Sequence, residues 1–260
     1  MGHKRYGFLP KTKPWISLVK ELDNFSSDNT DVTQIAKQTL QNVQTRFDRL
    51  EDDPSIYASF EFLLELSKAF QKEKPLEYLK EKGVFEESEI SVIKLGRWLK
   101  KYKNDEVVSK EYQTFARQAG IDALNKWYKA NIDSGVTLFS EGVDNEYVFS
   151  QIGKAGKFSD LTRYYFASFT ERYLKYYLER SASKTLTNIS EREQFSKEIE
   201  RHVKDISQHA FETTHITQSF IAGWHNKFAK GSQPSKRDIK NFLSFSFKKM
   251  KGELLREEVE

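Results

Sequence analysis

Residues 161–177 read LTRYYFASFTERYLKYY and decide the fold class. At ~100° per residue, the aromatic side chains and leucines of this stretch spread over more than half of a helix circumference, too wide for a helix with one apolar face. The stretch therefore predicts a central helix buried between two layers, with tyrosine hydroxyls hydrogen-bonded at the rim. The alternative is that Arg163, Arg172 and some of the tyrosines line a groove and contact bases or phosphates.

The composition is typical of a chain built mainly from helices. Of its 260 residues, 31% are charged, glycine occurs 12 times, proline 5 times and cysteine not at all. The lack of cysteine excludes disulfide frameworks, thiolate metal sites and cysteine nucleophiles. No apolar run follows the basic residues at the start, and no stretch approaches a membrane span in length. We therefore expect no signal peptide, no membrane partner and a cytoplasmic location.

Helix start and stop signals divide the chain. Proline at first helical positions, Ser or Asn caps and glycine stops predict helices at about 14–24, 29–50, 54–70, 75–82, from 88, 106–130, 159–180, 190–231 and 235–256. Residues 131–158 hold four glycines and one extended run, Val136–Phe139, which predict a linker or small hairpin. The expected fold is all-α, with two helical lobes of about nine or ten helices joined by this glycine-containing linker. The expected domains are a basic aromatic arm at 1–13, an N-terminal lobe at 14–130, the linker at 131–158 and a C-terminal lobe at 159–260.

The histidines do not have the spacing of a metal site. Four of the five are His202, His209, His215 and His225. The first two lie about 10 Å apart along a helix, too far to share one ion without further ligands. One Glu-x-x-His is present, Glu212 to His215, where a carboxylate-bridged di-iron bundle needs two. The sequence predicts solvated or capping histidines, no metal and no cofactor.

Catalytic templates are missing from the sequence as well. There is no Gly-x-x-x-x-Gly-Lys-Ser/Thr loop, no Gly-x-Gly-x-x-Gly, no His-Glu-x-x-His and no Gly-x-Ser-x-Gly. An acid pair in the core could serve a hydrolase, but 38 carboxylates offer too many pairs to select one. We therefore name no catalytic residue and expect a protein that is not an enzyme.

Positive charge gathers at the two ends of the sequence. Residues 1–20 sum to +5 and residues 216–252 to +7, while the whole chain is +4, so the remainder is −8. Segregation of this kind creates a local positive potential that attracts phosphates or an acidic partner more strongly than the net charge suggests. The sequence therefore places function in these two segments.

The last predicted helix can pack against the core and still present cations outward. Its apolar stripe consists of Ile239, Phe242, Leu243, Phe247, Met250 and Leu254. Basic side chains fall off this stripe, and those that we predict to bind nucleic acid or a partner are Lys236, Arg237, Lys240, Lys248 and Lys249. The alternative is a solvated helix face whose lysines serve solubility.

The N-terminal arm, HKRYGFLPKTKPW at residues 3–15, combines cations with aromatic rings. Pro10 and Pro14 favour extended backbone and Gly7 allows a sharp turn, so we expect an irregular strap. Its predicted binding cations are Lys4, Arg5, Lys11 and Lys13, and its predicted partner-binding aromatic residues are Tyr6, Phe8 and Trp15. A terminus that only covers the helical core is the alternative.

Two stretches, YGFLPKTKPW at 6–15 and FTERYLKYYLER at 169–180, resemble small helical proteins encoded in bacterial defence operons against phage. The resemblance implies a complex subunit that works beside an ATPase or nuclease encoded elsewhere. It transfers no functional residue to this sequence.

Three functions stay open at this point. The first is a non-enzymatic helical subunit that binds nucleic acid or an acidic partner through its basic segments, with an affinity that falls steeply with salt. The second is a protein–protein adaptor that buries its aromatic side chains against a partner. The third is a divergent metal-dependent hydrolase with dispersed acids.

Overall fold

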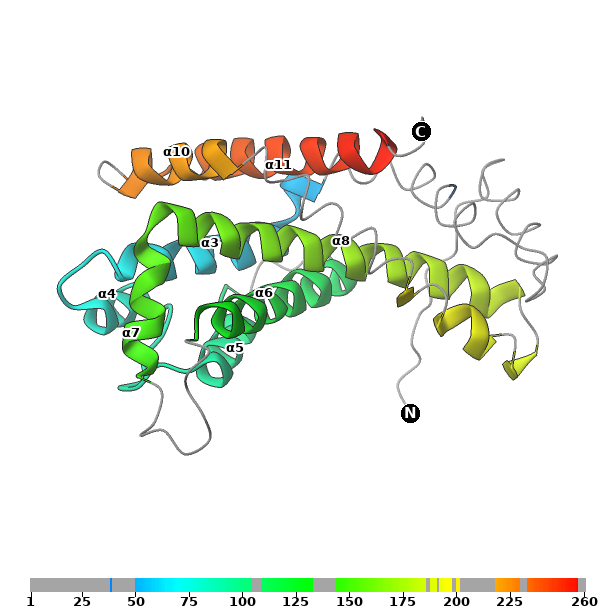
Figure 1. The fold of residues 1–260 in the computed structure, drawn as a ribbon, viewed down its shortest axis with the longest axis horizontal. Coiled ribbons are helices and arrows are strands. Elements are labelled where there is room, and N and C mark those ends of the chain that lie inside the picture. The colour runs from blue at the N-terminus through cyan, green and yellow to red at the C-terminus, as the bar shows by residue number, and fades with distance from the viewer. Residues whose placement is uncertain are drawn as a thin grey trace. The chain divides into compact units, whose positions relative to one another are not determined.

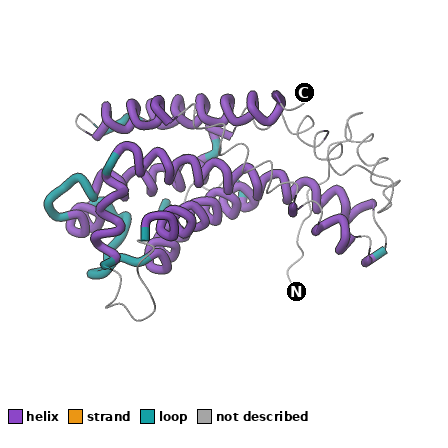
Figure 2. Tube along the Cα trace, viewed as in Figure 1, coloured by secondary structure: helices purple, strands orange, loops and turns teal. Residues whose placement is uncertain are grey.

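A computed structural model describes residues 38, 50–103, 109–132, 144–185, 188–190, 192–197, 200–201, 218–229 and 233–256. Helices account for 83% of these residues and no strand occurs among them, which confirms the all-α class. The chain divides into a smaller unit, Met1–Arg46 with Glu171–Ser207, and a larger unit, Phe47–Thr170 with Gln208–Glu260. Figure 1 labels the elements, and Figure 2 distinguishes helices from loops.

The named helices follow one another with short connections. They are η1 (Leu50–Asp52), α3 (Pro54–Ala69), α4 (Pro75–Glu81), α5 (Val92–Lys101), α6 (Lys110–Asn131), α7 (Asn145–Ser150), η3 (Gln151–Gly153), α8 (Ala155–Thr185), α10 (Gln218–Ala229) and α11 (Lys236–Arg256). In this part of the chain, no helix combines the length and the apolar content that a membrane crossing requires.

Short polar side chains fix the helix starts. The Asp53 carboxylate accepts hydrogen bonds from the amides of Ser55 at 2.8 Å and Ile56 at 3.3 Å, and so caps α3. At α11 the Asp238 amide donates to Ser235 Oγ at 3.2 Å, while the Ser235 amide donates to Asp238 Oδ2 at 2.9 Å. These hydrogen bonds lower the pKa of the Asp238 carboxyl, which stays charged at the helix N-terminus. The predicted starts at 54 and 235 thus stand within one residue of the structure.

Phe60 of α3 lies at the centre of the larger unit. Its side chain is fully buried, and its ring centroid lies 5.0–6.4 Å from those of Phe158, Tyr165, Phe166, Trp224 and Phe242. These rings come from α8, α10 and α11, so one α3 residue joins three other helices. Figures 1 and 2 show α10 and α11 on one side of α3 and the first half of α8, with α5 and α6 on the other side.

A second aromatic cluster closes the side of α6 and α7. Phe149 of α7 is fully buried and stacks on Trp127 at 6.1 Å and Tyr128 at 5.4 Å between ring centroids. The Trp127 indole N–H donates to the Lys157 carbonyl at 2.9 Å, which satisfies its polar atom at the start of α8. The cluster therefore connects α6, α7 and α8.

Gly153 sits where η3 meets the end of α3. A Cβ atom at this position would lie 2.8 Å from the Phe70 carbonyl oxygen and 3.0 Å from its carbon, both backbone atoms that cannot move aside cheaply. We expect Gly153→Ala to lower the free energy of unfolding by about 1–3 kcal/mol, as measured by chemical denaturation. The control is Gly156→Ala, where a Cβ would meet nothing within 4 Å. Equal stability of the two variants would show that the close approach does not constrain the fold.

The prediction of a central helix at 161–177 is confirmed. On α8, Leu161, Tyr165 and Phe169 are fully buried, and the Tyr165 hydroxyl donates to the Ile56 carbonyl at 3.4 Å. The alternative in which Arg163 lines a groove is wrong, since this side chain is 7% exposed and lies 3.6 Å from the Asp160 carboxylate. Aromatic width on a helix here indicates burial on several sides.

The predicted start of this helix at Ser159 is wrong. α8 begins at Ala155, directly after extended backbone at Lys154 (φ −80°, ψ 134°). Ser159 is buried within the helix instead of capping it. The helix extends back because Phe158 enters the core, where it is fully buried against Phe60 at 6.2 Å. A core contact therefore outweighs the cap signal.

The predicted linker at 131–158 is not confirmed. Residues 145–153 form α7 and η3, and Asp144 caps α7 by accepting from the Tyr147 amide at 3.0 Å. Residues 133–143, which hold the expected extended run Val136–Phe139, lie outside the described residues. The two predicted lobes are not confirmed either, because each compact unit combines segments from both halves of the chain.

The described part of the smaller unit is centred on the second half of α8. Tyr173 and Tyr177 are buried there with ring centroids 5.0 Å apart. Lys175 forms ion pairs with Glu179 at 3.8 Å and with Glu200 at 3.3 Å, which joins α8 to the segment around residue 200. Phe195 is 1% exposed. This unit therefore has apolar contacts of its own.

Candidate functional site

Helix α11 carries the predicted basic residues and is held against the larger unit by its apolar stripe. Ile239, Phe242 and Leu243 are buried, and Phe247 packs edge-on against Phe166 of α8 at 5.1 Å between ring centroids. Because the stripe is anchored in the core, the remaining circumference of α11 has a fixed orientation. The cations of α11 are therefore presented by a rigid element.

Two of the predicted cations of α11 interact with the larger unit. The Lys240 ammonium forms an ion pair with Asp52 of η1 at 2.9 Å, and one turn later Ser244 Oγ donates to Glu51 at 3.2 Å. Lys236 is exposed, with its Nζ 5.6 Å from the centroid of the Tyr57 ring. Lys240 therefore helps to hold α11 to η1, and Lys236 lies over an aromatic ring of α3.

The other three predicted cations point to solvent. Arg237, Lys248 and Lys249 are exposed, and the ion pairs found among the described residues include none of them. Lys249 Nζ lies 6.0 Å from the centroid of the Phe245 ring. Arg237 and Lys248 are 11 residues apart on α11, about 16 Å along the axis. The structure thus spreads these charges along one helix rather than gathering them at one point.

A third basic segment, at residues 94–103, was not predicted as a site. It holds Lys94, Arg97, Lys100, Lys101 and Lys103 without an acid. The structure pairs three of them with carboxylates: Lys94 with Glu87 and Glu89, Arg97 with Glu87, and Lys103 with Glu61. A charge count over this segment could have found it, but only the structure shows that it is largely neutralised. The comparison sets α11 apart, since one of its five predicted cations is paired in this way.

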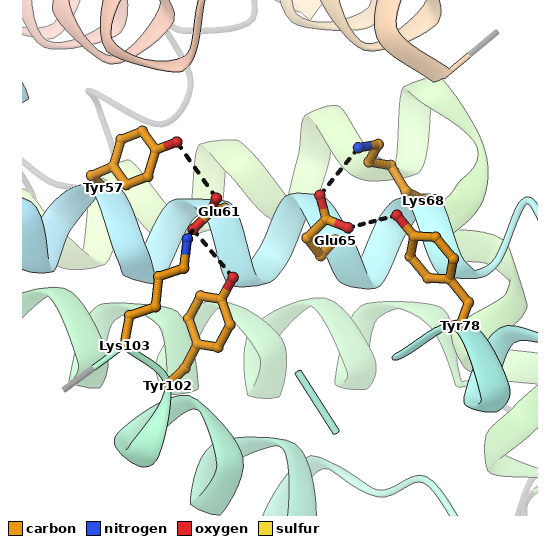
Figure 3. A network of polar contacts seen from close by, with 7 residues as sticks. All are labelled: Tyr57, Glu61, Glu65, Lys68, Tyr78, Tyr102 and Lys103. Carbon is orange, nitrogen blue, oxygen red and sulfur yellow. Dashed lines mark hydrogen bonds and ion pairs between the residues drawn. The ribbon is translucent and has the colours of Figure 1, made fainter. Parts of the chain in front are cut away.

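A strip of tyrosines and carboxylates runs along the surface of α3 (Figure 3). Glu61 accepts hydrogen bonds from the Tyr57 hydroxyl at 3.5 Å and the Tyr102 hydroxyl at 3.2 Å, and it also pairs with Lys103. One turn later, Glu65 accepts from the Tyr78 hydroxyl at 2.6 Å and from Lys68 at 3.1 Å. The side chains of Glu61 and Glu65 are 15% and 12% exposed, so this strip is half-buried.

The tyrosines of this strip act as hydrogen-bond donors to the carboxylates. Burial first, and then the neighbouring Glu61 or Glu65, raises the pKa of Tyr57, Tyr78 and Tyr102 above the ordinary value for tyrosine. Their hydroxyls therefore keep their protons at neutral pH. Because each carboxylate already holds a lysine and at least one tyrosine, the strip is suited to joining α3 with α4 and the end of α5 rather than to acid–base catalysis.

A buried polar contact joins α10 to α3 and η3. His225 is 1% exposed, and its Nε2 lies 2.8 Å from Ser67 Oγ and 3.2 Å from Gln71 Nε2. Ser67 also donates to the Ile152 carbonyl at 2.8 Å, and Gln71 donates to the Gly153 carbonyl at 2.9 Å. The expectation of a solvated or capping histidine is wrong for His225. Its place among Ile221, Trp224 and Phe228 in sequence is the signal that could have indicated burial.

The environment of His225 keeps its imidazole neutral. The ring stacks on Phe158 with centroids 4.6 Å apart, and Nδ1 is buried without a hydrogen-bond partner among the described residues. A second proton would therefore add an unpaired donor to the interior. Burial lowers the pKa of His225 from 6.5 to about 4. Ser67 is fully buried, so this pair serves to hold the three elements together rather than to act as a nucleophile and base.

The remaining predicted site residues lie outside the described residues. They are the arm residues Lys4, Arg5, Tyr6, Phe8, Lys11, Lys13 and Trp15, and the histidines His202, His209 and His215. In the part of the chain that is described, no group of three or more His, Asp or Glu side chains is placed to hold a metal ion.

Comparisons with known proteins gave no match: no family model, curated protein or solved structure is similar to this chain. The resemblance to defence-operon subunits, and the ATPase or nuclease partner that it implies, therefore stay predictions.

Proposed function

We propose that this chain is a non-enzymatic protein that binds nucleic acid through the exposed cations of α11, namely Arg237, Lys248 and Lys249. The observation that carries the proposal is the contrast between the two basic segments of the larger unit. Most cations at 94–103 are paired with carboxylates, whereas among the predicted cations of α11 an ion pair engages Lys240. Exposed cations without carboxylate partners are the ones available to phosphates.

The spacing and rigidity of α11 suit a phosphate backbone. The axial distance of about 16 Å between Arg237 and Lys248 is the length over which one stacked strand carries about five phosphates. The buried stripe and the Lys240–Asp52 ion pair at 2.9 Å hold the helix in place. Binding therefore requires ordering of side chains but not of the helix, which lowers its entropic cost.

The salt dependence of binding tests this proposal. We expect the logarithm of the affinity for a DNA or RNA oligonucleotide to fall linearly with the logarithm of salt concentration. In the double variant Arg237→Gln/Lys248→Gln, the slope becomes shallower by about 1.5 and the affinity falls about ten- to thirtyfold, since each phosphate contact contributes ~0.7–0.9 to the slope. Fluorescence anisotropy at several salt concentrations measures both quantities.

A charge-matched control separates a local interface from a diffuse attraction. Lys80 on α4 and Lys129 on α6 are also exposed, and Lys80→Gln/Lys129→Gln removes the same charge. We expect this control to change the affinity by less than about twofold. An equal loss in the two double variants, or binding that does not respond to salt, would contradict the proposal.

A further inference from the structure

An exposed aromatic ring lies between the cations of the α10–α11 pair. The Phe220 side chain on α10 is 39% exposed. Its inner side is fixed by Phe245 at 4.1 Å and by Phe242 at 5.9 Å between ring centroids, the latter nearly parallel at 9°. Phe242 itself is 1% exposed. Phe220 is therefore a ring held rigidly from below with one part open to solvent.

The helix surface beside this ring is free of side-chain atoms. Gly223 lies three residues after Phe220, on the same face of α10, and it is exposed. A Cβ atom at Gly223 would meet nothing within 4 Å. Lys227 follows one turn later on the same face, exposed and with its Nζ 5.0 Å from the centroid of the Phe228 ring. The face thus presents a ring, a bare stretch of backbone and a cation in sequence.

On α11 the neighbours of Phe245 are also basic. Lys248 and Lys249 lie three and four residues after Phe245, on the same side of the helix. The Lys249 ammonium is 6.0 Å from the centroid of the Phe245 ring. The Phe220–Phe245 pair is therefore flanked by Lys227 on one helix and by Lys248 and Lys249 on the other.

We propose that Phe220, Phe245 and the gap at Gly223 form a stacking platform that makes this surface selective for single-stranded nucleic acid. This inference rests on the proposed function of the α11 cations and adds the class of ligand. An unpaired base can stack on the open part of Phe220 while its phosphates reach the flanking lysines. In a duplex the bases are stacked on one another, so their faces cannot reach the ring, and only the lysines contribute.

Two pairs of variants test the platform. Gly223→Leu places a side chain against the Phe220 ring without entering the core, and Gly223→Ala is its control because a methyl group there covers little. Phe220→Leu keeps an apolar side chain but removes the ring, and Phe220→Tyr keeps the ring. Each variant is titrated in the full-length chain against a labelled oligothymidine strand and against the same strand annealed to its complement.

The expected result is a selective loss. Gly223→Leu and Phe220→Leu weaken binding to the single strand by about 5- to 10-fold, the lower end of the measured range for base stacking on an aromatic side chain. Gly223→Ala and Phe220→Tyr stay within about twofold of the unmodified chain. Duplex binding and its salt slope are unchanged in all four variants, since none of them removes a cation.

The failure of this inference can be told apart from the failure of the proposed function. Equal affinity for strand and duplex, with no effect of Gly223→Leu on either, overturns the platform but leaves binding by α11 in place. Binding to neither nucleic acid overturns both, and salt-dependent binding to phosphatidylserine vesicles in that case would assign the surface to lipid headgroups instead. A loss of strand binding in Gly223→Leu with retention in Gly223→Ala supports the platform.

Discussion

Replacing Phe60 with alanine lowers the free energy of unfolding by about 3–5 kcal/mol. This ring is fully buried and is in contact range of five aromatic rings from α8, α10 and α11. Its removal leaves a cavity where four helices meet, and rigid aromatic neighbours collapse into such a space poorly. Chemical denaturation, followed by the fluorescence of the buried Trp127 and the half-buried Trp224, measures the change.

Two further variants separate the cavity from a general loss of apolar surface. Phe60→Leu restores most of the volume and should cost less than about 1.5 kcal/mol if the neighbouring rings can repack. Ile93→Ala removes an apolar side chain that is 77% exposed, and it should change the free energy of unfolding by less than about 0.5 kcal/mol. A Phe60→Ala variant as stable as Ile93→Ala would mean that Phe60 is not at the centre of this core.

Acidification from pH 6.5 to pH 4 lowers the free energy of unfolding by about 3 kcal/mol through His225 alone. Burial lowers the pKa of this histidine from 6.5 to about 4 in the folded chain. Between these two values the unfolded chain binds a proton that the folded chain does not, so stability rises with pH in this window. The contribution is complete above pH 6.5 and is lost progressively as the pH falls toward 4.

The variant His225→Gln isolates this contribution from those of other titrating groups. Glutamine can still hydrogen-bond to Ser67 but does not titrate. We expect its free energy of unfolding to fall less with acidification, so that the difference between the two proteins narrows from neutral pH to pH 4 by about 3 kcal/mol. Parallel curves for both proteins between pH 4 and 7 would contradict a buried neutral imidazole.

The central helix and several helix starts could be predicted from the sequence because their causes are local. The aromatic residues of 161–177 exceed what a one-sided helix can bury, and the structure buries them. Asp53 and Ser235 cap α3 and α11 through contacts within three residues of themselves. The apolar stripe of α11 follows from the helical period. Signals of this kind do not depend on what the rest of the chain does.

Other features could not be predicted because they depend on contacts between distant segments. Ser159 carries a good cap signal, but the helix starts at Ala155 because Phe158 packs on Phe60. The neutralisation of residues 94–103 needs Glu61 and Glu87 to come close in space. The platform at Phe220 needs α10 to lie against α11. Charge counts and periodicity along one segment cannot supply such pairings.

The larger unit combines Phe47–Thr170 with Gln208–Glu260, and this order has a consequence for synthesis on the ribosome. Phe60 and Phe242, whose ring centroids lie 5.0 Å apart in the folded chain, leave the ribosome about 180 residues apart. At ~5–20 residues per second, the first ring waits roughly 10–40 s for the second. During that interval the nascent chain exposes a row of aromatic side chains on α3 and α8, which is the kind of surface that chaperones recognise and cover.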